Sequence, residues 1–215
     1  MAPKWFKPSG VVTTKSPVFA EKRDLLPFEE AKLYGHNAAH VLLGYLARRR
    51  GLRFIADIAS DGALLAYVRA AFLEESGAAL IAKHRGVDPL FSPAGYAAFA
   101  DDLLARMINP WLRDDIERVT RDPRRKLGWD DRLIGTMRLA LRAGIRPERF
   151  AVGAALALEE LQATLEGPAG SELLDLIWLS AKPPAAEAAE IKRLLVESPR
   201  SPGIPVCLRS GAGPN

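Results

Sequence analysis

The sequence predicts an all-α protein, a single compact domain of several helices with an irregular N-terminal arm and a disordered C-terminal tail. Apolar residues recur at helical spacing through a body rich in Ala and Leu. Runs of alternating β-branched and aromatic residues, which indicate strands, are almost absent after residue 20. Prolines gather at both ends. These observations divide the chain into an arm or linker (1–27), a helical substrate domain (28–197) and a flexible tail (198–215).

The composition narrows the class of protein further. The 215 residues are 48% apolar and 26% charged, enough for one sizeable core. A formal net charge of +4 is too small to indicate a nucleic-acid-binding surface. No apolar run approaches the roughly 18 residues of a membrane span, and no secretion signal opens the chain. A single cysteine, Cys207, cannot form an intramolecular disulfide. We therefore expect a cytoplasmic protein without a membrane or nucleic-acid partner.

Helix start signals occur in order along the body. Helical spacing begins at Glu29. Asp61 then precedes GALLAYVRAAFLEESGAALIAKH, and Ser92 with Pro93 precedes AGYAAFADDLLARM. Short polar side chains accept hydrogen bonds from the free N–H groups of a first helical turn, and proline is tolerated there. Each position therefore predicts a helix N-terminus.

The second half of the body carries similar signals. Asn109 and Pro110 break the pattern before WLRDDIERV, and Asp130 is placed to cap DRLIGTMRLALRAG. Pro147 precedes ERFAVGAALALEELQ, and Pro183 with Pro184 precedes AAEAAEIKRLLVE. We expect helices to follow all four signals, joined by short connections within one domain.

The first predicted helix contains KLYGHNAAH, which places Lys32, His36, Asn37 and His40 on one side. At about 100° per residue the four lie within about 140° of one another, and the apolar stripe faces the other way. Leucines intrude on this polar side, which predicts a half-buried pocket wall. A desolvated lysine there has a lowered pKa and can act as a general base, and a nearby amide can stabilise an alkoxide. The alternative is that Lys32 extends into solvent and the histidines are satisfied core residues.

His36 and His40 also have the i, i+4 spacing of zinc-binding helices. Asn37 stands where such a motif would place its catalytic glutamate, and the other histidine, His84, is distant in sequence. We therefore expect no metal site.

A basic segment follows within NPWLRDDIERVTRDPRRKLGWDDRL, from Asn109 to Leu133. Between Arg118 and Lys126 five cations meet one anion, a net charge of +4. Asp122 and Pro123 predict a turn from which the cations fan out, a geometry suited to a compact anion such as phosphate. The alternative is a solvated loop with local ion pairs to nearby aspartates. No aromatic residue lies between the cations, so a single-strand nucleic-acid surface is not indicated.

Three segments in this order, KLYGHNAAH, EESGAAL (Glu74 to Leu80) and the basic segment, resemble the C-terminal domain of mannitol-1-phosphate 5-dehydrogenases. These enzymes belong to the polyol-specific long-chain (mannitol) dehydrogenase family. The similarity runs from about Phe28 to about Leu158, and the pairing of K-x4-N-x2-H with R-V-x2-D-P-x-R-K-L carries most of its specificity.

The resemblance implies a role for each matching residue. Lys32 matches the general base that takes the hydroxyl proton as hydride leaves the same carbon for NAD. Asn37 and His40 match the groups that hold the reacting oxygen and its neighbour, and Arg118 with Lys126 matches basic positions that close over the substrate. The implied activity is an NAD-dependent oxidation of mannitol 1-phosphate to fructose 6-phosphate, without a metal.

Members of the family carry a Rossmann domain before this helical one, and the 215 residues contain no segment that resembles it. The Gly-x-Gly of the chain, Gly211 to Gly213, has neither a strand before it nor a helix after it. We therefore expect the substrate-binding and catalytic half of an oxidoreductase, inactive alone, with a polyol or sugar phosphate as ligand and a separate Rossmann-domain polypeptide as a candidate partner. The alternatives are a non-catalytic sugar-phosphate-binding module and a decayed remnant whose former interdomain surface is exposed.

Overall fold

The computed structural model describes residues 22, 24–199 and 203. Most of the predicted arm and tail, with Cys207, lies outside them. Within the described ranges the backbone forms helices and turns without a strand, and the pairing of Phe54 with Asp115 is an isolated antiparallel bridge. The predicted all-α fold class is confirmed.

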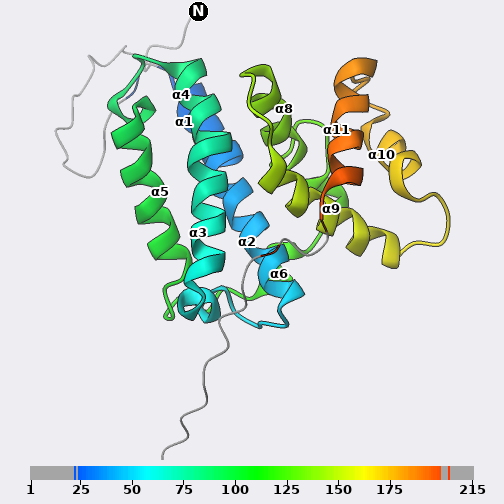
Figure 1. Cartoon of the computed structure of the whole chain (residues 1–215), viewed down its shortest axis with the longest axis horizontal. Helices are drawn as coiled ribbons and strands as arrows, with labels where there is room; N and C mark the ends of the chain where they lie inside the picture. The colour runs from blue at the N-terminus through cyan, green and yellow to red at the C-terminus, as the bar shows by residue number, and fades with distance from the viewer. Residues whose placement is uncertain (1–21, 23, 200–202, 204–215) are drawn as a thin grey trace, which may run out of the picture.

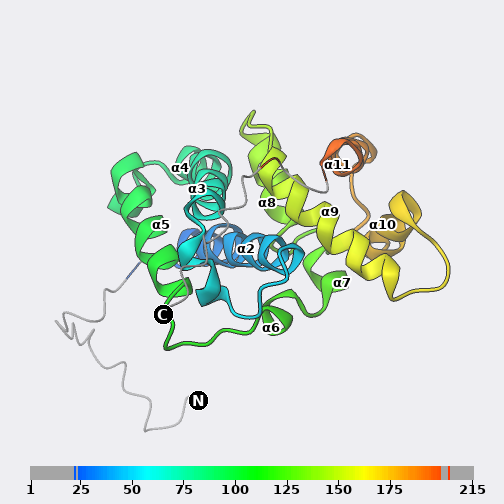
Figure 2. The same ribbon diagram turned by 60° about the horizontal axis from the view of Figure 1, so that its bottom comes forward.

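The first helix is long and central. It is made of α1 (Leu26–Glu30), η1 (Ala31–Asn37) and α2 (Ala38–Arg49), which run on without a break because the junction residues keep right-handed helical dihedral angles. It begins slightly earlier than the predicted Glu29, with Pro27 in its first turn. In Figure 2 it lies between two groups of helices, α3 to α5 on one side and α8 to α11 on the other.

The second and third predicted helices are confirmed together with their caps. After the 3₁₀ turn η2 (Ile55–Ser60), Asp61 accepts a hydrogen bond of 3.0 Å from Leu64 N and begins a continuous helix. Its parts are α3 (Gly62–Ala70), η3 (Ala71–Gly77) and α4 (Ala78–His84). After η4 (Pro89–Phe91), Ser92 Oγ accepts from Gly95 N at 3.1 Å and opens α5 (Pro93–Met107).

The remaining helices are α6 (Ile116–Thr120), α7 (Pro123–Lys126), α8 (Ile134–Arg142), α9 (Glu148–Ala163), α10 (Gly170–Trp178) and α11 (Ala185–Glu197). The starts after Pro147 and after Pro183 and Pro184 are as predicted. Two other predictions are wrong. Residues 111–115 are turn and extended backbone, with Asp115 capping α6. Asp130 does not cap α8, because the helix begins a turn later and the Asp130 carboxylate pairs with Arg138.

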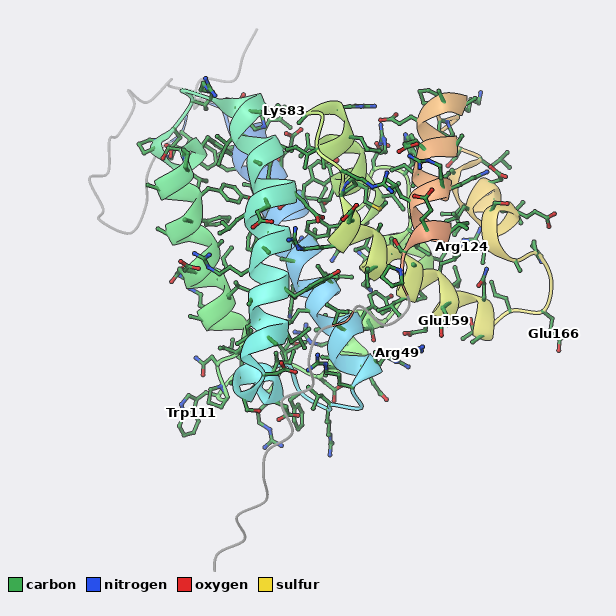
Figure 3. All side chains as sticks on the ribbon, in the orientation of Figure 1. Arg49, Lys83, Trp111, Arg124, Glu159 and Glu166 are labelled. Carbon is green, nitrogen blue, oxygen red and sulfur yellow. The ribbon has the colours of Figure 1, made fainter. Side chains whose placement is uncertain are left out.

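The core surrounds α2. This helix packs against α3, α6 and α9, and Figure 1 shows it passing behind α3 toward α6. At the edge of this packing Arg49 lies beside Glu159 of α9, with an N–O distance of 3.0 Å (Figure 3). The largest fully buried side chains include Trp178, Tyr96, Phe72, Phe150 and Leu42. The described helices include none that is both long and apolar enough to cross a bilayer.

Two π-helical stretches, η1 and η3, pack against each other at the centre of this core. A Cβ atom at Gly35 in η1 would overlap the Tyr96 hydroxyl, and one at Gly77 in η3 would lie 2.7 Å from the Phe72 carbonyl oxygen. Both positions therefore require glycine. A π-helical turn holds more residues than the 3.6 of an α-helix, so η1 rotates the side chains that follow it.

Candidate functional site

The π-helical stretch η1 changes the face that carries the predicted catalytic residues. Its backbone bonds link residues five apart, so Lys32 and Asn37 come close to one line along the helix. The wheel of a regular α-helix separates these two residues by about 140°. His36, Asn37 and His40 are half-buried, as predicted for a pocket wall. The π turn therefore narrows the face that Lys32, His36, Asn37 and His40 share.

Lys32 itself differs from the expectation. Lys32 is exposed on η1, so the described residues do not shield its amine from solvent. The prediction of a partly buried lysine is therefore wrong, and the exposure agrees with the alternative that the amine extends into solvent. Its charge still acts on the site, because it helps to lower the pKa of His36.

The two histidines form a stacked pair. The ring centroids of His36 and His40 lie 6.1 Å apart and the rings are tilted by 16°. Burial lowers the pKa of His36, with smaller contributions from Lys32 and from Arg106 at the end of α5. Both rings thus favour their neutral forms, which suits groups that exchange hydrogen bonds with a hydroxyl.

His40 faces a carboxylate on the loop between α5 and α6. Its Nε2 atom is buried and lies 3.1 Å from Asp114 Oδ2, without the alignment of a full hydrogen bond. Burial lowers the pKa of His40 to about 4, assisted by His36 and Arg118, although Asp114 opposes the shift. The ring is therefore neutral near pH 7.

Arg118 joins this group through the same carboxylate. The side chain is exposed, and its Nε atom donates to Asp114 Oδ1 at 3.0 Å. The Asp114 backbone is held in turn, because its carbonyl oxygen accepts from Ile55 N at 2.9 Å. From the sequence, Asp114 is expected only as one of the nearby aspartates that form local ion pairs with the cations. Its position four residues before Arg118 was the available signal, whereas its approach to His40 depends on the tertiary fold.

Lys126 is held differently from Arg118. It is only 2% exposed, and burial, with Arg132 and Arg125 nearby, lowers its pKa to about 8. Its segment lies along the first helix, because Tyr45 Oη donates to Thr120 O at 3.0 Å and Tyr34 Oη donates to Asp130 O at 3.3 Å. The segment that carries Lys126 therefore contacts the first helix at Tyr34, before Asn37, and at Tyr45, after it.

The predicted basic turn forms at Asp122. This residue has a left-handed backbone with φ of 57°, and its side chain accepts from Arg125 N at 3.2 Å. Arg125 pairs with Asp122, and Arg118 pairs with Asp114. Part of the positive charge is therefore neutralised locally, as the alternative of a solvated loop with local ion pairs predicts. Arg121 and Arg124 are exposed and form no ion pair with another described residue. They are the cations left available to an anion.

The EESGAAL segment lies in η3 and α4, and its two glutamates contact α9. Glu75 is 2% exposed, and its carboxylate is directed at the N-terminus of α9. Glu74 pairs with Arg149 at 2.9 Å. These two glutamates have no predicted chemical role, and their contacts are structural.

The loop that holds Asp114 also presents an apolar tip. Trp111 is 90% exposed, and Figure 3 shows it projecting away from the helices. The adjacent Leu112 is 61% exposed. In the described part of the chain no group of three or more His, Cys, Asp or Glu side chains is arranged to hold a metal ion.

The comparisons with known proteins give one family and one fold. The model of the mannitol dehydrogenase C-terminal domain matches residues 24–197. The structure of Pseudomonas fluorescens mannitol 2-dehydrogenase in ternary complex with NAD and D-mannitol is 21% identical, with a TM-score of 0.59 over 81% of this chain and 39% of that one. A substrate-free D-sorbitol dehydrogenase is also 21% identical, with a TM-score of 0.56 over 80% of this chain and 38% of its own. The chain thus shares their fold and spans about two fifths of their length.

Proposed function

The chain belongs to the mannitol dehydrogenase C-terminal domain family, and we propose that it supplies the polyol-binding and proton-transferring part of an NAD-dependent polyol oxidoreductase. The observation that supports this proposal is the π-helical form of η1, whose wider turn would bring Lys32 toward the face of the half-buried Asn37 and His40. Asp114 and Arg118 lie beside that face.

Oxidation of an alcohol requires removal of the hydroxyl proton and support for the oxygen that loses it. In the proposal Lys32 accepts this proton. Its exposure in the described residues fits a group covered only when a second domain closes over the face, since burial beneath that domain would favour the neutral amine. Asn37, at the end of the π-helical stretch that contains Lys32, donates its side-chain amide to the developing alkoxide in this proposal. His40, being neutral, accepts a hydrogen bond from a neighbouring hydroxyl.

NAD is bound in the Pseudomonas fluorescens relative. The described residues of this chain do not fit a dinucleotide, since they contain no glycine-rich turn between a strand and a helix to cradle a pyrophosphate. In the proposal the cofactor is held by a nucleotide-binding domain outside these residues, on a separate polypeptide or on another part of a longer protein. The roles of this chain concern the substrate hydroxyls.

We propose a phosphorylated polyol, of the mannitol 1-phosphate type, as the substrate. The support is the basic turn, where Arg121 and Arg124 form no ion pair with described residues, and the segment around Lys126, which contacts Tyr45 and Tyr34 of the first helix through Thr120 and Asp130. The planar guanidinium group of arginine can donate two parallel hydrogen bonds to phosphate oxygens. A free polyol has no phosphate for these cations to bind, so the cations should contribute to binding of the phosphorylated polyol and not of the free one.

A non-catalytic sugar-phosphate-binding module is the second candidate. The exposure of Lys32 favours it, because an amine in water is a poor general base near neutral pH. This candidate keeps the cations of the basic turn and predicts binding without oxidation.

The test is NADH formation by the full chain mixed with the nucleotide-binding domain of a family relative. Mannitol, sorbitol and mannitol 1-phosphate are supplied separately. The proposal expects NADH, fastest with mannitol 1-phosphate, and loss of at least two orders of magnitude in rate on Lys32→Met. Lys182→Met, at an exposed lysine on a distant turn, is the control and should leave the rate unchanged. Binding of sugar phosphate without NADH in any pairing would favour the second candidate instead.

A further inference from the structure

We propose that Asp114 is a positioning residue that fixes the tautomer of His40, with the proton on Nε2 and the lone pair on Nδ1 directed to a substrate hydroxyl. The role toward substrate rests on the proposed function. The tautomer itself is a property of this chain alone and can be tested without turnover.

The distance between the two groups carries the argument. Nε2 of His40 lies 3.1 Å from Asp114 Oδ2. A nitrogen lone pair facing an anionic oxygen at this separation is repelled, whereas an N–H group is attracted. A neutral imidazole has one proton to place, so the carboxylate draws it to Nε2.

The ring is neutral under ordinary conditions and has no competing acceptor at this atom. Burial keeps the pKa of His40 near 4, so the choice between two neutral tautomers is the relevant one at pH 7. Nε2 is fully buried and makes no aligned hydrogen bond with any described residue. Asp114 Oδ2 is therefore the acceptor nearest to a proton on His40 Nε2 among the contacts of the described residues.

Both partners are held in place. The Asp114 carbonyl oxygen accepts from Ile55 N, and its Oδ1 accepts from Arg118 Nε at 3.0 Å, which leaves Oδ2 directed at the imidazole. The His36 ring stacks on the His40 ring, with ring centroids 6.1 Å apart and a tilt of 16°. The charged and titratable groups acting on His40 are Asp114, His36 and Arg118, from α6, its loop and the first helix.

This arrangement gives Asp114 and Arg118 a role different from direct anion binding. Arg118 holds the carboxylate, the carboxylate sets the imidazole, and the imidazole presents Nδ1 as an acceptor. An acceptor at that atom selects a substrate with a free hydroxyl next to the reacting carbon, which a polyol supplies.

The experiment is long-range ¹H–¹⁵N correlation of the imidazole rings in the ¹⁵N-labelled full chain at pH 7. Signals are assigned with His36→Gln and His84→Gln variants. We expect His40 to carry its proton on Nε2 in the unmodified chain. In Asp114→Ala the preference should fall at least several-fold toward a mixture, and the His40 titration should move to lower pH, because the anion that favours the charged ring is gone.

Asp115→Asn is the matched control. Its carboxylate caps α6 through Glu117 N at 2.8 Å, and it should leave the His40 tautomer unchanged. If Asp114→Ala does not fold, Asp114→Asn keeps the size of the side chain, removes its negative charge and should also weaken the preference for Nε2. A proton on Nδ1 in the unmodified chain, or an unchanged tautomer in both Asp114 variants, would overturn the proposal. Correct tautomer without NADH formation would count against the proposed function alone.

Discussion

The carboxylate of Glu75 accepts a hydrogen bond of 2.9 Å from the backbone nitrogen of Arg149, and its second oxygen accepts one of 3.1 Å from Phe150 N. Glu75 lies in η3 and these nitrogens lie in the first turn of α9, so a side chain from one helix caps another. Pro147, which precedes α9, offers no side-chain cap of its own. The contact ties the two helix groups on either side of α2 together.

This cap makes stability depend on pH. Burial raises the pKa of Glu75 from 4.5 to about 7, against the opposing hydrogen bonds from Arg149 and Phe150. Between these values the unfolded chain loses a proton that the folded chain retains, so stability falls as pH rises from about 4.5 to about 7 and is level above. Glu75→Gln should remove this slope, worth up to about 3 kcal/mol.

Chemical unfolding at pH 5 and pH 8 measures the effect. The stability difference between the unmodified chain and Glu75→Gln should be larger at pH 5 than at pH 8. Glu74→Gln, at the exposed neighbouring carboxylate, is the control and should change little at either pH. An equal difference in stability between the unmodified chain and Glu75→Gln at pH 5 and pH 8 would refute the raised pKa of Glu75.

The π turn of η1 should depend on Gly35. In Gly35→Ala the new Cβ would overlap the Tyr96 hydroxyl and lie 3.0 Å from Phe72 Cε2, so we expect a loss of about 1–3 kcal/mol. Gly62→Ala, at a helical glycine with open space, should be neutral or slightly stabilising. Denaturant unfolding measures both.

A second change checks the cause of that loss. Tyr96→Phe removes the hydroxyl that the new Cβ meets, so the double variant Gly35→Ala with Tyr96→Phe should recover part of the stability. Strict additivity of the two single changes would show that the hydroxyl is not the obstacle.

We expect the buried amine of Lys126 to lower the free energy of unfolding. Its pKa is lowered from 10.5 to about 8, so the folded chain binds fewer protons than the unfolded chain between these values, and stability rises as pH increases through that window. Lys126→Met should stabilise the chain at pH 7 by about 1–2 kcal/mol while weakening substrate binding. The gain should shrink by pH 10.

Arg124→Met provides the comparison for Lys126. Arg124 is exposed on the same short helix, so its replacement should change stability by less than about 0.5 kcal/mol. Thermal unfolding at pH 7 and pH 10 separates the two variants. A destabilised Lys126→Met would mean that the ammonium is held by favourable contacts.

Local signals were sufficient for much of the fold. Asp61 and Ser92 cap helices through contacts three residues away, which depend on the sequence nearby. The π turn at Gly35 could not be predicted in this way, because it depends on Tyr96 and Phe72 from other helices. Asp130 was misassigned as a cap because its carboxylate pairs with Arg138 instead.

The site was predicted in part. The identities of the residues on the first helix follow from spacing, but their alignment follows from the π turn. Asp114 approaches His40 only through the tertiary fold. Lys126 stands among exposed arginines in the sequence, and its burial results from packing of α7 against α9. The roles of these residues toward a substrate stay predictions.

The most direct measurement is a titration of polyols into the labelled full chain, following the His36 and His40 ring signals and the Asn37 side-chain amide. D-mannitol and mannitol 1-phosphate are compared at high millimolar concentration. We predict saturable shifts at these three residues, with tighter binding of mannitol 1-phosphate that weakens when Arg121 and Arg124 are replaced by Gln. Shifts confined to another surface, or none with either compound, would contradict the assignment of this face as the polyol site.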